Sequence, residues 1–415
     1  MSRSPGSIFT LARGLLVPGN IRILALTSMM TGIYVSMLNT ILQPFVVNNL
    51  GFSVAILGTL VAVGSRPTGL ASSIVQPFAG QLADLLGRRL LIVAGSAVGI
   101  CSMVSFLVAA ATHSLAPLAV GYFLFGLSLL GNPATQATIA ETVAMDPGKV
   151  NVAFSVVFFF TALPGAFIPF AAGYLASALG FGILFGAAAL LESANLVVLI
   201  AQLGETRPSR RRDEAKPRNS FSFRQSVRVP PGFLRIFTPF AMDAFSFGLG
   251  GAIIYGMWTK QFGLTTDDIG LIFGTLSVSI VVSHYLATKL LLRAGTRRTL
   301  AFSEFLTVVV MLGWFLSPTV PALIFLSVIF GFSVATWVPA QSSLMMTAAP
   351  VEERGSIWGK LAAFRGLIAF PAPIIGGFLF ESFGYYVPVS LGLIGEIFTT
   401  FAILKLIPKE TRLRP

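Results

Sequence analysis

The chain has 415 residues, of which 11% are charged and 55% are hydrophobic, and its formal net charge is +12. Soluble domains carry about 25% charged residues, so these apolar side chains exceed what a water-exposed fold of this length can bury. Lipid is therefore the expected solvent for most of the surface. Runs that are apolar on nearly every face also exclude membrane strands, which alternate polar and apolar residues over about 10 positions.

Residues 1–20 are a predicted cytoplasmic tail, because their apolar stretch is too short for a signal peptide and no small-residue cleavage site follows. A membrane helix needs about 20 apolar residues to cross a hydrocarbon core of about 30 Å. Runs of this kind lie at 21–47, 54–83, 88–111, 115–144, 148–178, 182–203, 233–259, 267–293, 297–317, 320–349, 353–381 and 385–407. We expect a transmembrane helix in each, because helices satisfy their backbone hydrogen bonds internally.

The basic residues gather on one side of the predicted spans. With the N-terminus inside, the arginines at 88–89, 207–235 and 293–298 all face the cytoplasm, and only Lys260 lies clearly outside. This distribution follows the positive-inside rule and predicts a multi-pass protein of the cell membrane with both termini cytoplasmic. The net charge is thereby attributed to topology, so we expect contact with anionic membrane lipid and no nucleic-acid binding.

The longest polar stretch, residues 204–232, divides the spans into six and six. It is rich in arginine and proline and is predicted to be a cytoplasmic linker. The predicted domains are therefore an N-terminal six-helix bundle at 21–203, a C-terminal bundle at 233–407 and a cytoplasmic tail at 408–415.

The two halves also repeat each other in sequence. Gly51 matches Gly263 at an offset of 212, and Glu192 matches Glu396 at an offset of 204. A slowly drifting offset is expected when duplicated halves differ by small loop deletions. Parallel repeats of six spans are a transporter architecture, with the substrate path between the halves near the membrane midplane.

One loop joins the second and third spans on the cytoplasmic side. It reads Gly80-Gln81-Leu82-Ala83-Asp84-Leu85-Leu86-Gly87-Arg88-Arg89. In sequence and position it resembles the signature loop of the major facilitator superfamily (MFS), and the resemblance covers the whole chain. It implies an all-α membrane protein of about twelve transmembrane helices in two pseudo-symmetric six-helix bundles.

The resemblance also implies that this loop gates the cytoplasmic side. Gly80 removes a side chain where span two approaches span eleven, and Asp84 latches the gate. Arg88 or Arg89 is expected to pair with an acid at the end of span four, either Glu141 or Asp146. The expected gating residues are therefore Gly80, Asp84, Gly87, Arg88, Arg89 and Glu141. In the second half Leu292 replaces the aspartate, which predicts an asymmetric gate.

Charged residues inside spans are costly, so each is a hypothesis about function. Arg66, Asp243 and Arg365 are expected deep in spans two, seven and eleven, where the MFS resemblance implies that they converge. One interpretation is a structural ion pair. The alternatives are an arginine that binds an anionic substrate and Asp243 as a proton-coupling site. Glu192, Glu396 and Glu304 are expected to be structural, Glu304 near the cytoplasmic end.

The spans expected to line a central cavity carry several hydrogen-bonding and aromatic side chains. These candidates are Tyr34, Asn39, Gln43, Asn132, Gln136, Trp258, Trp337 and Gln341. Such a mixture suits a mostly apolar pocket for a small molecule. His113 and His284 are too separated for a metal site, and we expect no metal and no cofactor.

We therefore predict a monomeric secondary active transporter of a small organic solute, not an enzyme, that works by alternating access and is coupled to protons. Efflux is favoured over uptake, although Ile168 to Gly173 keeps only part of the motif typical of drug antiporters. One alternative is an organic-anion transporter that uses the intramembrane arginines. An alternative from another functional class is a membrane sensor that has the same fold but does not transport a solute.

Overall fold

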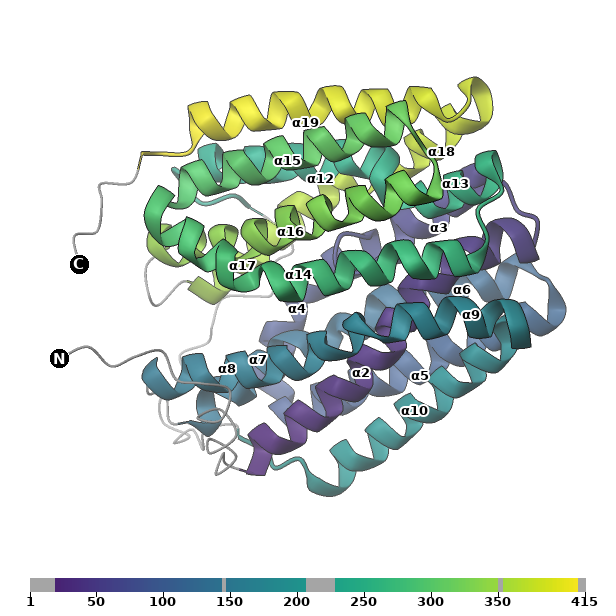
Figure 1. Ribbon diagram of the computed structural model, residues 1–415. Helices are drawn as coiled ribbons and strands as arrows, with labels where there is room; N and C mark the ends of the chain where they lie inside the picture. Colours follow the sequence, from purple (N-terminus) through teal and green to yellow (C-terminus); the bar gives the residue numbers. More distant parts are fainter. Residues whose placement is uncertain (1–18, 144–146, 207–227, 350–353, 410–415) are drawn as a thin grey trace.

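The computed structural model describes residues 19–143, 147–206, 228–349 and 354–409, apart from the side chains at a few helical positions such as Asp84. This described part consists of helices and connecting turns, arranged as two bundles (Figure 1). The first bundle contains α2 (Gly19–Pro44), α3 (Val54–Gly64), α4 (Leu70–Leu86), α5 (Arg88–Thr112), α6 (Leu115–Leu127), α7 (Asn132–Thr142), α8 (Pro147–Ala162), α9 (Ile168–Leu179) and α10 (Phe181–Gln202).

The second bundle repeats this order after the linker. It contains α12 (Leu234–Gly250), α13 (Ile254–Phe262), α14 (Thr266–Ala294), α15 (Thr296–Leu316), α16 (Val320–Ala348), α17 (Arg354–Ala369), α18 (Pro371–Phe383) and α19 (Tyr386–Leu406). Short irregular turns, η1 (Phe45–Asn49), η2 (Ser128–Gly131), η3 (Leu163–Ala166) and η5 (Gly251–Ile253), extend or join helices. The predicted all-α membrane fold of two bundles is thereby confirmed.

Ten helices in the described residues are long and apolar enough to cross a membrane, and the bent pair formed by Val152–Ala166 and Ile168–Leu179 makes up to eleven. The span predicted at 54–83 is not one continuous helix. It breaks between α3 and α4 at Ser65 to Gly69, because Pro67 lacks a backbone donor and the residue before a proline avoids the helical region.

The two ends of the molecule are packed differently. We call the end at which α5 and α15 begin the basic end, since Arg88, Arg89, Arg297 and Arg298 lie there, and the opposite one the far end (left and right in Figure 1). At the far end one hydrophobic core runs through both bundles, from Phe45 of the first to Trp258 of the second. Toward the basic end each bundle has a separate core. A core shared by the two halves is therefore found at the far end and not at the basic end.

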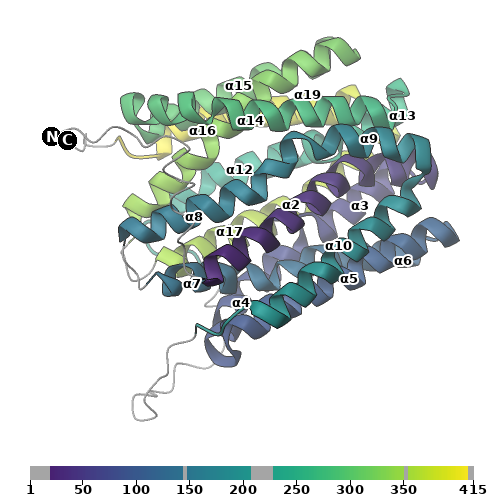
Figure 2. The same cartoon turned by 60° about the horizontal axis from the view of Figure 1, so that its bottom comes forward.

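Hydrogen bonds also join the halves at the far end. Gln43 Nε2 donates to Ala252 O at 2.8 Å, and its Oε1 accepts from Gly256 N at 2.9 Å. Val54 N donates to Glu381 Oε1 at 2.7 Å. Two long seams continue this interface, α3 against α18 and α9 against α14, and the second is visible in Figure 2.

Candidate functional site

A cavity of about 730 Å³ lies on the inner side of the first bundle. Of its lining residues, Ser342 of α16 comes from the second bundle and the rest come from the first. Polar side chains from several helices reach it, including Tyr34, Arg66, Asn132, Gln136 and Glu192. Leu24 and Ile139, toward the basic end, also line it, so the cavity extends toward the end where the bundles have separate cores.

Arg66 lies in the break between α3 and α4. The break is held by Ser72 Oγ, which lies 2.8 Å from both Pro67 O and Gly69 O. The Arg66 guanidinium stacks over the Phe125 ring, with Cζ 5.0 Å from its centroid. Arg66 Nη1 is buried and meets no hydrogen-bond partner in the described part of the chain. A donor without a partner at a cavity wall is available to an acceptor on a bound molecule.

Glu192 of α10 is the acid of this cavity. Its side chain is buried, Ser96 Oγ donates to Oε1 at 2.6 Å, and Asn195 Nδ2 donates to Oε2 at 3.0 Å. These donors stabilise a carboxylate away from water. The cavity therefore offers a cation at Arg66 and an acid at Glu192.

A second group of charges lies in the second bundle. Arg365 Nη2 of α17 donates to Asp243 Oδ2 of α12 at 2.7 Å. Asp243, Glu304 and Glu396 each place one carboxylate oxygen within 4.8 Å of the others. At such a separation two like charges repel by about 3 kcal/mol even at an effective dielectric constant of about 20.

The three acids could in principle hold a cation. The Arg365 guanidinium already bonded to Asp243 places a positive charge beside that position, which opposes a metal ion. Arg66, expected to converge with Asp243 and Arg365, lines the cavity of the first bundle, and no ion pair among the described residues links it to either.

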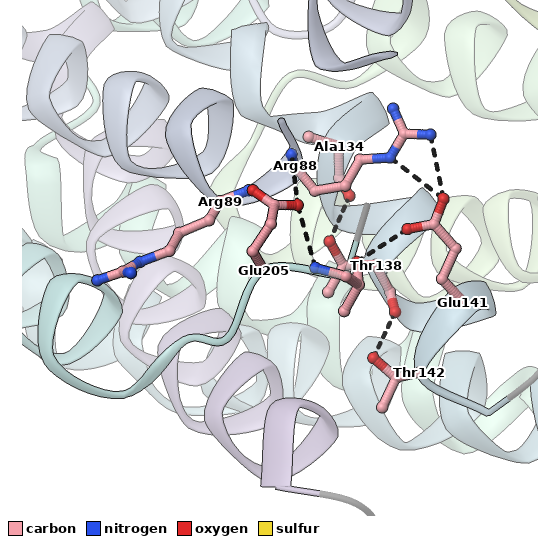
Figure 3. Close-up of polar contacts among 8 residues, drawn as sticks. Arg88, Arg89, Ala134, Thr138, Glu141, Thr142 and Glu205 are labelled. Atoms are coloured by element: carbon pink, nitrogen blue, oxygen red, sulfur yellow. Dashed lines mark hydrogen bonds and ion pairs between the residues drawn. The ribbon is translucent and has the colours of Figure 1, made fainter. Parts of the chain in front are cut away.

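The loop at the basic end forms a network of its own (Figure 3). Gly87 turns the chain between α4 and α5 with φ +107°. Arg88 Nη2 lies 3.1 Å from Glu141 Oε1 of α7. The Glu205 carboxylate accepts from the backbone N–H groups of Arg88 at 3.0 Å and Arg89 at 3.2 Å. An anion at the N-terminus of α5 is stabilised by these backbone N–H groups and by the helix dipole.

Two details bear on the expected gate. Among the described residues, a Cβ on Gly80 would meet only Pro133 Cβ, at 4.0 Å. The described parts of spans two and eleven approach closely where a Cβ on Gly366 of α17 would overlap Ser73 Oγ of α4. The Asp84 side chain and Asp146 lie outside the described residues.

The sequence profile of the Major Facilitator Superfamily matches residues 24–257 and 236–415. The chain belongs to the major facilitator superfamily. It is a multi-pass membrane protein of this transporter family.

Individual relatives of this MFS chain are distant. The human MFS-type transporter SLC18B1 is 28% identical over 185 residues, which span 41% of this chain and only 40% of that relative. The structure of the human organic anion transporter MFSD10 (TETRAN) matches with a TM-score of 0.68 at 15% identity, covering 92% of this chain and 98% of that one. An inward-facing, occupied bacterial homologue of the human lysosomal transporter Spinster matches with a TM-score of 0.65 at 15% identity, covering 93% and 94%. At these identities the two structures establish the fold alone.

The structure divides the predicted cavity residues of this MFS chain. Tyr34, Asn132 and Gln136 line the cavity, whereas Trp258 and Gln43 are not among its lining residues. Trp258 is buried in the far-end core, where its Nε1 donates to Tyr385 Oη at 2.9 Å, and Gln43 joins the two halves. The remaining candidates, Asn39, Trp337 and Gln341, are not among the lining residues either.

Three acids expected to be structural lie at the polar sites of this MFS fold. Glu192 lines the cavity, and Glu304 and Glu396 lie beside Asp243. The sequence signal that could have indicated these sites is the depth of each acid along its helix. Asp243, Glu304 and Glu396 each lie about two to three turns from the basic end of a helix. Glu304 is therefore deeper than a position near the cytoplasmic surface.

Proposed function

We propose that this MFS chain is a proton-coupled secondary transporter that moves a small organic solute across the cell membrane by alternating access. The observation that supports this proposal most strongly is the cavity of about 730 Å³. The bundles beside it share one core at the far end and have separate cores at the basic end. Since the basic end collects the arginines, we assign it to the cytoplasm. The described conformation is then open inward, with both termini cytoplasmic.

Proton coupling is supported by the Asp243–Arg365 ion pair. Its side chains are 14% and 24% exposed, so the pair is only partly buried. In the proposed mechanism, water on the inward-open side reaches this pair. Protonation of Asp243 removes its negative charge and releases Arg365, which gives the proton a structural effect.

In the proposed gate, the Arg88–Glu141 pair and Glu205 hold the loop between α4 and α5 in one of its states.

Asp243→Asn is the test of coupling. We first select solutes that raise the melting temperature of the purified protein, then add them to proteoliposomes holding a trapped fluorescent pH indicator. Wild-type protein is expected to move protons when such a solute crosses, and Asp243→Asn is expected to lose this proton movement. An unchanged proton signal in Asp243→Asn would exclude Asp243 as the coupling residue.

The charges of the cavity support a second candidate, transport of an organic anion. Arg66 presents a donor without a partner, whereas Glu192 already has two donors, so the unsatisfied group favours an anionic solute. We expect Arg66→Gln to reduce uptake of carboxyfluorescein into proteoliposomes by about tenfold, the effect of losing about 1.4 kcal/mol of binding. Glu192→Gln, on the same cavity wall, is the matched comparison. A larger loss in Glu192→Gln than in Arg66→Gln would argue against an anionic substrate.

A further inference from the structure

The four charged groups of the second bundle come from four helices. Asp243 lies on α12, Arg365 on α17, Glu304 on α15 and Glu396 on α19. The side chains of Glu304 and Glu396 are buried, at 2% and 0% exposure, behind the more exposed ion pair. Other charged side chains described on the helices packed here lie nearer an end of the bundle; they are Arg235, Arg297, Arg298, Lys360, Glu381 and Lys405.

These groups do not balance one another as ions. Three carboxylates face one guanidinium, so two negative charges stay uncompensated when all are ionised. Neither oxygen of Glu396 meets a hydrogen-bond donor in the described part of the chain, and Glu304 Oε2 meets none either. Nearby hydroxyls are directed elsewhere, since Thr399 donates to Gly395 O and Thr307 bonds within the α15–α16 contact. Buried anions without donors require a bound positive species.

The internal repeat indicates what that species is. An offset of 208 relates Gly87 to Gly295, the glycines that begin α5 and α15, and relates Ser96 to Glu304. In the first bundle Ser96 Oγ donates a hydrogen bond to Glu192 Oε1 at 2.6 Å. In the second bundle the equivalent acid is Glu396, and the equivalent of the serine is a second acid, Glu304. Glu304 reproduces the donor of the first bundle only when its own carboxyl carries a proton.

We propose that Glu304 and Glu396 form a buried carboxyl pair that binds protons, with the Asp243–Arg365 ion pair as the entrance. A proton that arrives on Asp243 breaks its bond to Arg365. It then passes to a Glu304 or Glu396 oxygen, and Asp243 regains its negative charge and its arginine. Two bound protons make the four-residue cluster neutral. The role in coupling rests on the proposed function, whereas proton binding is measured without transport.

Infrared difference spectroscopy of the purified protein tests the proposal, using the C=O stretching band of protonated carboxyl groups and its shift in heavy water. Wild-type protein at neutral pH is expected to show this band, and Glu396→Gln and Glu304→Gln are each expected to lose intensity. Glu381→Gln, a carboxyl-to-amide change at the far end, is the matched control and is expected to retain the band. A band of full intensity in both cluster variants overturns the proposal.

A further variant covers the case in which the amide variants fold poorly. Glu304→Ser places a hydroxyl where the first bundle has Ser96, so this variant is expected to fold while losing its share of the carboxyl band. Retention of the full band in folded Glu304→Ser overturns the proposal.

Two further measurements separate the proposal from its rivals. Calorimetric titration with NaCl and CaCl₂ asks whether a metal ion neutralises the cluster. Binding of Na⁺ or Ca²⁺ that Glu396→Gln abolishes would overturn the proton assignment. If the cluster variants leave the carboxyl band unchanged but Asp243→Asn still abolishes solute-linked proton movement, the proton site is wrong and the proposed transport stands.

If the cluster variants weaken the band but no screened solute moves protons, the proton site stands and the proposed transport is wrong.

Discussion

Glu192 and Glu396 occupy equivalent positions in the two halves, yet they meet different neighbours. Two neutral donors satisfy Glu192, whereas Glu396 faces Glu304 and the Asp243–Arg365 pair. Removal of one partner of a buried ion pair leaves an uncompensated charge. Arg365 therefore contributes more to the stability of the second bundle than its single hydrogen bond to Asp243 suggests, because it compensates a buried negative charge.

We expect Arg365→Gln to be more destabilising than the double variant Asp243→Asn/Arg365→Gln. Loss of one partner of a buried pair costs about 3–5 kcal/mol, and the partial exposure of this pair favours the lower value, about 3 kcal/mol. The double variant removes the stranded carboxylate and recovers part of this loss. Thermal unfolding of four purified proteins, namely the wild type, the two single variants and the double variant, measures the coupling between Asp243 and Arg365. Equal losses in the single and double variants would show that the pair contributes nothing beyond Arg365 itself.

The sequence shows how deep each of these charges lies but not which way it faces. Asp243 and Arg365 could be predicted as deep charged residues because a helix rises about 1.5 Å per residue. Their meeting with Glu304 and Glu396 depends on the rotation of four helices about their axes. In lipid the apolar pattern that would fix this rotation is weak, since both lipid and the core select the same residues. Arg66 was misplaced for the same reason.

At the scale of elements, the internal repeat extends to backbone conformation. The pairs Gly51 and Gly263, Gly87 and Gly295, and Gly180 and Gly384 all have positive φ at equivalent turns. The helices that follow the turns at Gly51 and Gly263 also have similar N-caps, Ser53 before α3 and Thr265 before α14. These turns were predictable because glycine and capping residues act locally. The break between α3 and α4 was missed, although Pro67 and Gly69 signal it.

Two of these glycines give a matched prediction. Gly87 and Gly180 share a conformation near φ +100°, ψ +155° that side chains adopt at a cost of about 1–3 kcal/mol. A Cβ at Gly180 meets open space, whereas at Gly87 it would lie 2.6 Å from Glu205 Oε2. We expect Gly87→Ala to be the more destabilising of the two, because it also displaces the Glu205 carboxylate from the start of α5. The measurement is the melting temperature of each variant. Equal decreases in the two variants would show that the Glu205 contact does not contribute to the difference.

At the scale of the whole molecule, the two seams between the bundles are built alike. Gly58 of α3 faces the Pro373 carbonyl and Gly377 of α18, and Gly270 of α14 faces the Pro169 carbonyl and Gly173 of α9. These contacts bring helix backbones together, as small residues do in membranes. The offset of 212 relates Gly58 to Gly270 and the offset of 204 relates Pro169 to Pro373, so equivalent residues build the two seams. In the proposed alternating-access mechanism, the bundles rock about these close backbone contacts.

Gly58 therefore tests whether the far-end seam sets the conformation. A Cβ there would overlap Pro373 O, so Gly58→Ala is expected to push α3 from α18 and favour a far end that opens. The reporter is Val47→Cys, buried at 3% exposure in the shared core, in a Cys101→Ser background because Cys101 is the chain's one cysteine and is exposed. Gly58→Ala should speed labelling of Cys at position 47 by a water-soluble maleimide. Gly186→Ala, where a Cβ meets nothing within 4 Å, should leave the labelling rate unchanged. If both alanine variants label at the wild-type rate, close packing at Gly58 does not hold the far end closed.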